Sequence, residues 1–210
     1  GSRSLRWHRH GGGRLALFRI ALMNDARSAL RKELRERRAA IPAASRIAAA
    51  EAVARQLLRM PAMQDAKTAA GYWAVGGELP LHSLVTRLPA QTRYCLPVLQ
   101  PSRTLGFAPW HVGDAIAANR FGLPEPADTT GLLDATALDV VLLPLIGYTR
   151  NGDRLGTGGG WYDRSFAFRR HAASPPILIG VAFACQQIDG GRGTSMQAQE
   201  WDVPLDAIVT

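Results

Sequence analysis

A short run of apolar residues, from Val140 to Leu145, restricts the possible folds more than any other part of the sequence. Even and odd positions of this run are both apolar, whereas a strand with one solvated face would alternate apolar and polar residues. A strand of this kind lies in the middle of a sheet that is covered by helices on both faces. The run therefore predicts an α/β protein.

The rest of the chain agrees with this prediction. Further short apolar runs bounded by Gly, Pro or Asp predict strands at 68–75, 94–98, 105–110 and 177–184. Helical periodicity predicts helices at 24–38, 43–60, 81–88 and 162–171, with Pro42 and Pro61 at the ends of the second. Several strands are expected in hairpins. We therefore expect a single three-layer α/β domain, with a central mixed sheet flanked by helices and two N-terminal helices.

Positive charge is concentrated at the start of the chain. Residues 1–22 hold five arginines and no acid, so only +3 of the net charge of +8 belongs to residues 23–210. We interpret residues 1–22 as a disordered basic tail or a mis-assigned start before Met23, with a targeting peptide as the rival interpretation. Residues 23–210 are expected to form the α/β domain. Because the charge gathers in the tail, no nucleic-acid partner is expected, although a nucleic-acid-binding protein stays as an alternative.

Composition also bears on the compartment. No apolar run reaches the roughly 18–20 residues that cross a bilayer, so no membrane partner is expected. Two cysteines, Cys95 and Cys185, lie in apolar stretches without the spacing of metal ligands. They indicate buried thiols in a reducing compartment, and hence a cytoplasmic protein.

The glycine-rich segment from Pro144 to Arg164 carries the strongest functional signal. It leads from the buried strand into an expected helix, and four of its five residues from Gly156 to Gly160 are glycine. Backbone amides in such a loop, together with a helix N-terminus, favour an anion, and Arg154 adds a cation that can pair with phosphate. The segment fits neither the P-loop nor the dinucleotide pattern. A plain surface turn is the alternative, and phosphate binding is favoured over it.

Residues Asn151 to Arg164, NGDRLGTGGGWYDR, resemble the signature of the 5-formyltetrahydrofolate cyclo-ligase family, RLGxGxGYYD, with Trp161 in place of a tyrosine. The resemblance implies that this loop wraps the phosphates of ATP and that Asp163 helps to hold Mg²⁺. The ATP-binding residues it implies here are Arg154, Leu155, Gly156, Thr157, Gly158, Gly159, Gly160, Trp161 and Tyr162.

Two segments further toward the N-terminus resemble the same family. Arg27, Leu30 and Arg31 match its opening Lys-x-x-Leu-Arg, with arginine in place of the lysine. The i, i+4 spacing of the two arginines puts them on one helix face that could bind a polyanion. Trp73 and Glu78 match positions that contact the folate in the family, together with Gly158, Gly160 and Trp161 of the loop. In isolation, the two arginines would indicate a solvated basic face and Glu78 an ordinary charge at a helix start.

The C-terminal segment resembles the family's ending, His-Asp-x-x-x-Asp followed by a strand. Trp201 replaces the histidine, and Asp202 matches the second aspartate associated with magnesium. Mg²⁺ prefers one or two carboxylates completed by phosphate oxygens and water. The segment from Arg120 to Pro126 also resembles the family, and its prolines favour a rigid linker.

The resemblance implies an ATP-dependent ligase that closes 5-formyltetrahydrofolate to 5,10-methenyltetrahydrofolate, with ATP and the folate as partners and Mg²⁺ as cofactor. ATP would phosphorylate the formyl oxygen and N10 would then attack, with Arg154 as the catalytic residue. The enzyme is expected to be a monomer. The alternatives are a paralogue that binds ATP but acts on another acyl-amine, and a regulatory nucleotide sensor.

Overall fold

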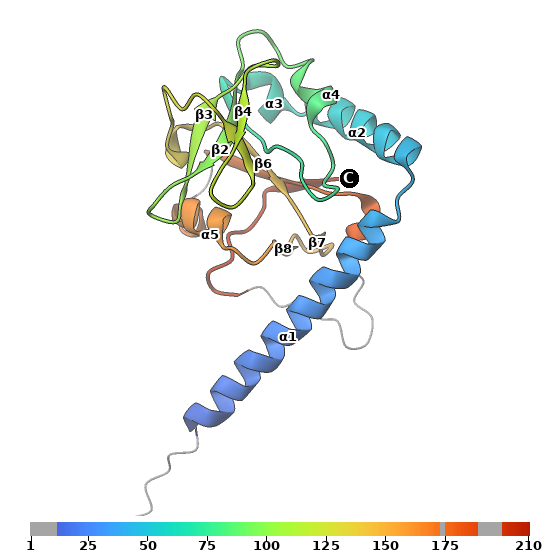
Figure 1. Ribbon diagram of the computed structural model, residues 1–210, viewed down its shortest axis with the longest axis vertical. Helices are drawn as coiled ribbons and strands as arrows, with labels where there is room; N and C mark the ends of the chain where they lie inside the picture. Colours follow the sequence, from blue (N-terminus) through green and yellow to red (C-terminus); the bar gives the residue numbers. More distant parts are fainter. Residues whose placement is uncertain (1–11, 173–174, 189–198) are drawn as a thin grey trace, which may run out of the picture.

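The chain forms a six-stranded mixed sheet with helices on both faces (Figure 1). This computed structural model describes residues 12–172, 175–188 and 199–210. The helices are α1 (Gly12–Ala39), α2 (Ala43–Leu58), α3 (Pro61–Asp65), α4 (His82–Val85) and α5 (Trp161–Ser165), with 3-10 turns η1 (Ala135–Ala137), η2 (Ala167–Arg170) and η3 (Ala184–Gln186). The strands are β1 (Thr68–Ala70), β2 (Arg93–Leu99), β3 (Leu105–Pro109), β4 (Ile116–Ala118), β5 (Pro124–Pro126), β6 (Val140–Pro144), β7 (Gly147–Tyr148), β8 (Arg154–Leu155), β9 (Ile177–Val181) and β10 (Ala207–Val209).

The main sheet has the strand order β10-β9-β6-β1-β2-β3. Neighbouring strands are parallel except at the β3 edge, where β3 runs antiparallel to β2. The predicted mixed sheet is therefore confirmed. β6 lies between β9 and β1, and its Val141 and Leu142 side chains are fully buried although they point to opposite faces. The apolar run that predicted a central strand is explained by this position.

Two separate apolar cores cover the two faces of the sheet. One contains Leu142 of β6 and Leu57 of α2, together with residues of α3 and α4. The other contains Val141 of β6 and Phe166, the residue after α5, together with residues around η1. Helices thus pack on both faces, as the predicted three-layer arrangement requires (Figure 1).

The first helix begins earlier than the sequence predicted. α1 starts at Gly12, not at Asn24, so residues 12–22, which were expected to be part of a disordered tail, are helical. Once a strong helix-forming segment has nucleated, each further residue adds one backbone hydrogen bond at little cost. The helix can therefore extend backward through a segment with no apolar period of its own. The rest of the expected tail, residues 1–11, lies outside the described residues.

Other element boundaries differ from the prediction for local reasons. Pro61, which was expected to end a helix, occupies the first position of α3, where its missing N–H costs nothing. The segment 120–126, expected to be a rigid linker, contributes β5 to a small hairpin with β4. Cys95 is buried as predicted, but Cys185 is exposed because it lies in η3, beyond the end of β9.

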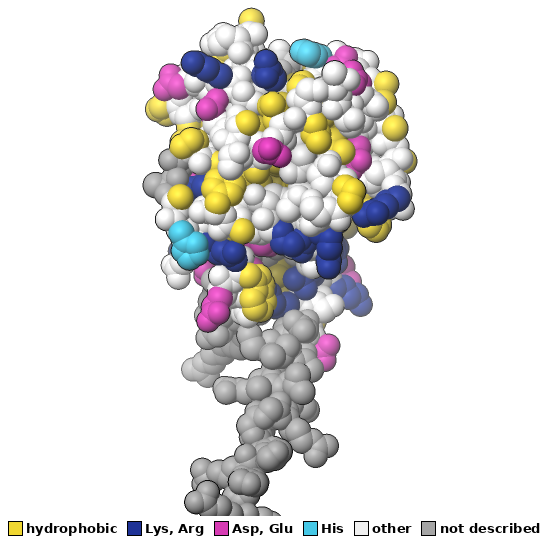
Figure 2. Space-filling model, turned by 90° about the vertical axis from the view of Figure 1, so that its left-hand side faces the viewer, with side chains coloured by type: hydrophobic (Ala, Val, Ile, Leu, Met, Phe, Trp, Pro, Cys, Tyr) yellow, Lys and Arg dark blue, Asp and Glu magenta, His cyan; other side chains and the backbone are white. Residues whose placement is uncertain are grey.

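Charge is distributed unevenly over the surface. Figure 2 shows Lys and Arg side chains gathered in a band across the lower part of one face, whereas hydrophobic side chains and scattered charged side chains of both signs lie above it. Among the described residues, none of the helices combines the length and the apolar character that a membrane crossing requires.

Candidate active site

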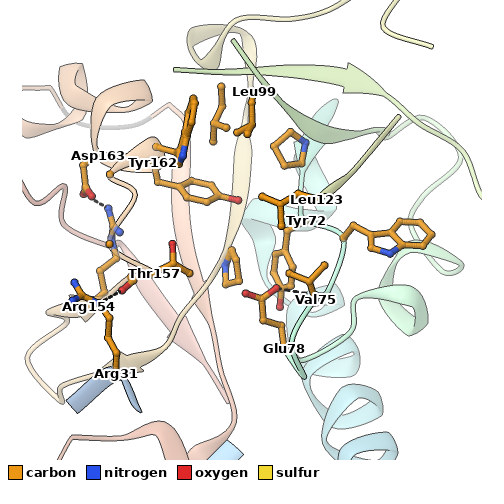
Figure 3. A pocket seen from close by; sticks show the side chains of 18 of the residues that line it. Arg31, Tyr72, Val75, Glu78, Leu99, Leu123, Arg154, Thr157, Tyr162 and Asp163 are labelled. Atoms are coloured by element: carbon orange, nitrogen blue, oxygen red, sulfur yellow. Dashed lines mark hydrogen bonds and ion pairs between the residues drawn. The ribbon is translucent and has the colours of Figure 1, made fainter. Parts of the chain in front are cut away.

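A cavity of about 510 Å³ opens at the carboxyl ends of the parallel strands. Leu99 at the end of β2 and Pro144 at the end of β6 line it, and so does Tyr72, which follows β1. Ligands of open α/β sheets characteristically bind at this edge. We call this space the central cavity. Figure 3 shows its two sides, with Arg31, Arg154, Thr157 and Asp163 on one and Tyr72, Val75, Glu78 and Leu123 on the other.

Residues Gly156–Gly160, the glycine loop, form part of the first side. The loop leaves β8 and ends at Gly160, the N-cap residue of α5. Gly158 and Gly160 have φ angles of 99° and 65°, in the left-handed region that favours glycine. A side chain at Gly158 would also stand 3.5 Å from the guanidinium carbon of Arg31. The loop thus keeps its backbone open toward the central cavity, which suits close approach to an anion.

Helix α1 places its cations against this loop. Arg27, Arg31, Leu34 and Arg38 occupy one helix face, because their spacings of four, three and four residues each complete about one turn. Leu34 is 1% exposed and packs on Leu155 of β8 and its neighbours, which fixes the helix. Nε of Arg31 donates to the carbonyl oxygen of Gly156 at 2.9 Å. Burial, and then the positive charge of Arg27, lower the pKa of Arg31, so an anion here would relieve an unfavourable charge.

Arg154 is held in place by an ion pair and a backbone contact. Its guanidinium is paired with Oδ1 of Asp163, and its Nε donates to the carbonyl oxygen of Val203 at 3.3 Å. The same Asp163 oxygen accepts the N–H of Val203 at 3.2 Å. Arg154 is 8% exposed, and both side chains line the central cavity. The arrangement fixes a buried cation beside the glycine loop before any ligand arrives.

Asp202 is the neighbour of Val203 and also lines the central cavity. Its Oδ2 lies 3.4 Å from Nη2 of Arg27 and accepts the N–H of Gln199 at 2.9 Å. These contacts bring both predicted magnesium ligands, Asp163 and Asp202, to one part of the cavity. Each of them is paired with an arginine.

The donor set suits a cation that arrives with its own ligands. Within the described part of the chain, no three acidic, His or Cys side chains gather into a metal-binding cluster. Asp163 and Asp202 are both paired with arginines, which compete with a cation for the carboxylate oxygens. Mg²⁺ usually keeps several waters and binds through one or two carboxylates plus substrate phosphates. Asp163 and Asp202 fit that role if phosphate oxygens complete the set.

The opposite side of the cavity is aromatic and holds the half-buried carboxyl group of Glu78. Trp73 is partly exposed and packs edge-on against Trp110, with ring centroids 5.7 Å apart. Tyr72 is buried and donates its hydroxyl to the carbonyl oxygen of Leu79 at 2.7 Å. Burial raises the pKa of Glu78, although a hydrogen bond from the N–H of Val75 and the charge of Arg38 oppose the shift. This side suits a flat ring that carries hydrogen-bond donors.

The hairpin of β4 and β5 supplies a wall that the sequence did not predict. Asn119 and Glu125 both line the central cavity. Oε1 of Glu125 accepts from the N–H of Leu99 at 2.8 Å and from Nδ2 of Asn119 at 2.7 Å, which fastens the hairpin to the end of β2. A polar residue between two prolines, Glu125, was a sequence signal for this wall. Only the tertiary structure shows that its side chain reaches the end of β2.

The structure brings together nearly all of the predicted site residues. The predicted residues that line the central cavity are Arg27, Arg31, Trp73, Glu78, Arg154, Gly156, Thr157, Gly158, Gly160, Trp161, Tyr162, Asp163 and Asp202. Trp201, whose role was open, also lines it and is 59% exposed. Two predicted ATP-binding residues do not. The side chain of Leu155 is fully buried in the core beside Leu34, and Gly159 faces Arg164, which donates to its carbonyl oxygen at 2.9 Å.

Fold and cavity together place the chain among α/β proteins whose ligand cavity lies at the carboxyl ends of the strands. Within that class it belongs to the 5-formyltetrahydrofolate cyclo-ligase family, because the model of that family matches residues 23–210. The chain is therefore a ligase of folate metabolism. The resemblance seen in the glycine-rich segment is confirmed.

Relatives and solved structures support this membership. The chain is 33% identical to the 5-formyltetrahydrofolate cyclo-ligase of Escherichia coli (strain K12) over 84% of its own length and 96% of the relative's. It is 31% identical to that of Haemophilus influenzae over 85% of its length and 94% of the relative's. Its fold is similar to the NMR structure of Aquifex aeolicus 5,10-methenyltetrahydrofolate synthetase, with a TM-score of 0.72, 24% identity, and coverage of 87% and 88% of the two chains.

Proposed function

We propose that this chain converts 5-formyltetrahydrofolate and ATP into 5,10-methenyltetrahydrofolate, ADP and phosphate. The observation that carries the proposal is the two-sided central cavity. One side offers a glycine loop, the buried Arg154 and the half-buried Arg27 and Arg31, which suit the phosphates of ATP. The other offers aromatic rings and Glu78, which suit a pterin. A single cavity of about 510 Å³ that contains both sides would allow the two substrates to meet.

The chemistry needs activation of a poor electrophile. The formyl oxygen attacks the γ-phosphorus of ATP, and the bond to the β,γ-bridging oxygen breaks to release ADP. N10 then attacks the activated formyl carbon and loses its proton. Expulsion of phosphate leaves the methenyl bridge between N5 and N10. Transfers of this kind ask the protein for positioning and charge stabilisation, with no need of a protein nucleophile.

The arginines and glycines are assigned to the phosphates. In this proposal the glycine loop, Arg27 and Arg31 bind ATP, and Arg154 stabilises the transferring phosphoryl group. A buried polar atom supports the assignment, since Nε of Arg27 has no hydrogen-bond partner within the described residues. A phosphate oxygen would satisfy that donor, and an unpaired buried donor is otherwise costly.

Asp163 and Asp202 are assigned to Mg²⁺ carried by ATP. The cation would neutralise charge on the phosphate oxygens. The two carboxylates would orient the ATP–Mg²⁺ complex beside Arg27 and Arg154, with which they are paired. We further propose that the enzyme is a cytoplasmic monomer.

Trp73 and Glu78 are assigned to the folate. The 2-amino group and ring N–H of a pterin form a pair of adjacent donors, which a carboxylate can accept together. Trp73 offers a ring face or edge at the open mouth of the cavity.

The test is an absorbance assay with single omissions. Purified protein is mixed with 5-formyltetrahydrofolate, ATP and Mg²⁺, and the near-ultraviolet absorbance of methenyltetrahydrofolate is followed. Growth of absorbance that requires all three components is expected. Retained ATP binding without product would point to another acyl-amine substrate, and loss of ATP binding would refute the assignment of the glycine loop.

A further inference from the structure

The backbone before Glu78 forms a tight turn, Val75–Glu78, which we call the Glu78 turn. The N–H of Glu78 donates to the carbonyl oxygen of Val75 at 3.1 Å. Between them, Gly76 and Gly77 have φ angles of 55° and 80°, as two central left-handed residues do in a type I′ turn. Oε2 of Glu78 accepts the N–H of Val75 at 3.1 Å, so the turn and the carboxylate form one closed unit.

Two arginines from two different helices bind the carbonyl groups of this turn. Nη2 of Arg38, near the end of α1, donates to the carbonyl oxygen of Gly76 at 2.7 Å. Nη1 of Arg46, in the first turn of α2, donates to the carbonyl oxygen of Gly77 at 2.9 Å. Charged donors make stronger hydrogen bonds than neutral ones, and two on adjacent carbonyls fix the orientation of the turn as well as its place.

Both arginines are themselves held firmly. Arg38 is 4% exposed. Arg46 donates through Nε to the carbonyl oxygen of Ile41 at 3.1 Å and through Nη2 to the carbonyl oxygen of Arg38, and it lies over the ring of Phe183 at 5.5 Å. The connection between α1 and α2 and the Glu78 turn are therefore joined through one guanidinium.

We propose that Arg38 and Arg46 are positioning residues for folate recognition, which hold the carbonyl groups of Gly76 and Gly77 so that Glu78 is directed into the central cavity. The inference rests on the proposed function, because it concerns how Glu78 meets the folate. The two arginines act through Glu78 and do not line the cavity themselves.

The placement of the turn distinguishes positioning from mere stabilisation. Gly76 and Gly77 are exposed, so the hydrogen bonds that fix them bury no apolar surface of the core. Val75 and Glu78, on either side of them, line the central cavity. Nη1 of Arg38 is also buried without a hydrogen-bond partner within the described residues. A buried arginine with an unsatisfied donor lowers the stability of the fold. Stability alone therefore does not account for an arginine at position 38.

The test compares Arg46→Met and Arg38→Lys with wild type, using Arg55→Met on the exposed part of α2 as the matched control. The dissociation constants of 5-formyltetrahydrofolate and ATP are measured by calorimetry, KM is measured for each substrate, and thermal unfolding checks the fold. We expect Arg46→Met to weaken folate binding about 5- to 10-fold, as loss of a charged hydrogen bond would, with ATP binding changed less than about twofold. Arg55→Met should match wild type. If Arg38→Lys fails to fold, Arg46→Met alone decides.

A double-mutant cycle with Glu78→Gln supplies the sharper readout. Residues that act through one carboxylate are not additive, so Arg46→Met should change folate binding by less than about twofold once Glu78 is replaced. Equal loss of ATP and folate binding, or an undiminished effect in the Glu78→Gln background, overturns the inference. If the wild type binds the folate without turnover, the proposed reaction is refuted. The double-mutant cycle of folate dissociation constants then still tests the inference. Wild type that binds no folate overturns both.

Discussion

The two sides of the central cavity are stabilised in different ways. One side, which we propose binds phosphate and call the phosphate side, is made of the glycine loop, α1 and the C-terminal segment. It consists of backbone and ion pairs, such as Arg154 with Asp163 and Arg27 with Asp202. The other side, which we propose binds the folate and call the folate side, is made of the Glu78 turn and the residues after β1. It consists of packed aromatic rings and a carboxyl group whose pKa is raised by burial. A polyanion needs fixed cations and open amides, whereas a flat heterocycle needs apolar surface with a single directed acceptor. Changes on one side should therefore alter the kinetics of one substrate.

The largest effect is expected at Arg154. Arg154→Ala should lower kcat about 10²- to 10³-fold, because a preorganised cation facing the developing charge is lost. Steady-state kinetics with both substrates measure it, and the exposed Arg150→Ala in the same hairpin serves as control. Thermal unfolding is followed as well, since Asp163 loses its partner. An unchanged kcat in a folded variant would refute the catalytic role.

The next effect in size tests the glycine loop. Gly158→Ala should weaken ATP binding about 10-fold or more, because φ of 99° is unfavourable for alanine and the new methyl group would occupy space beside Arg31 that the proposal gives to phosphate. Gly152→Ala has a comparable φ of 89° but opens onto free space, and it controls for backbone strain alone. Calorimetry with ATP should separate the two variants. Equal losses of ATP affinity in Gly158→Ala and Gly152→Ala would contradict the assignment of the glycine loop to ATP.

On the folate side, Trp73→Ala should raise KM for 5-formyltetrahydrofolate about 10-fold and leave KM for ATP nearly unchanged. Removal of an aromatic contact typically costs this much when the ring packs on a ligand. Phe121→Ala, an exposed aromatic residue that does not line the cavity, is the control. If both substrates were affected alike, the division of the cavity into two sides would fail.

The smallest effect concerns stability. The pKa of Glu78 is raised by burial in the folded chain, so the ionised carboxylate opposes folding above that pKa. Glu78→Gln should therefore raise Tm at neutral pH, on the order of 2–4 °C. The gain should shrink as pH falls through the raised pKa toward the ordinary value near 4.3. Thermal unfolding between pH 4 and pH 8 measures the difference in Tm between Glu78→Gln and wild type. A difference that grows toward low pH would contradict the raised pKa of Glu78.

The sequence predicted the phosphate side better than the folate side. The glycine loop is continuous in sequence, so its motif could be recognised without knowledge of the tertiary structure. Leu155 shows where a motif misleads, because alternation along β8 turns Arg154 to the cavity and Leu155 to the core.

The folate side depends on contacts between distant segments. No sequence motif singles out Arg38 or Arg46, and only packing shows that they reach the Glu78 turn. The wall formed by Asn119 and Glu125 likewise depends on a hairpin and its attachment to β2, which no local pattern specifies. The start of α1 at Gly12 was not predicted, because the prediction relied on apolar periodicity and a helix can extend without an apolar face.

The face of α1 described above carries a constraint on how the chain can change in length. Arg31 at the glycine loop and Arg38 at the Glu78 turn belong to one continuous helix. A single inserted or deleted residue between them would rotate one end by about 100° relative to the other and shift it by about 1.5 Å. Insertions and deletions in this stretch should therefore be excluded among active variants of the chain, whereas length changes before Arg27 should be tolerated.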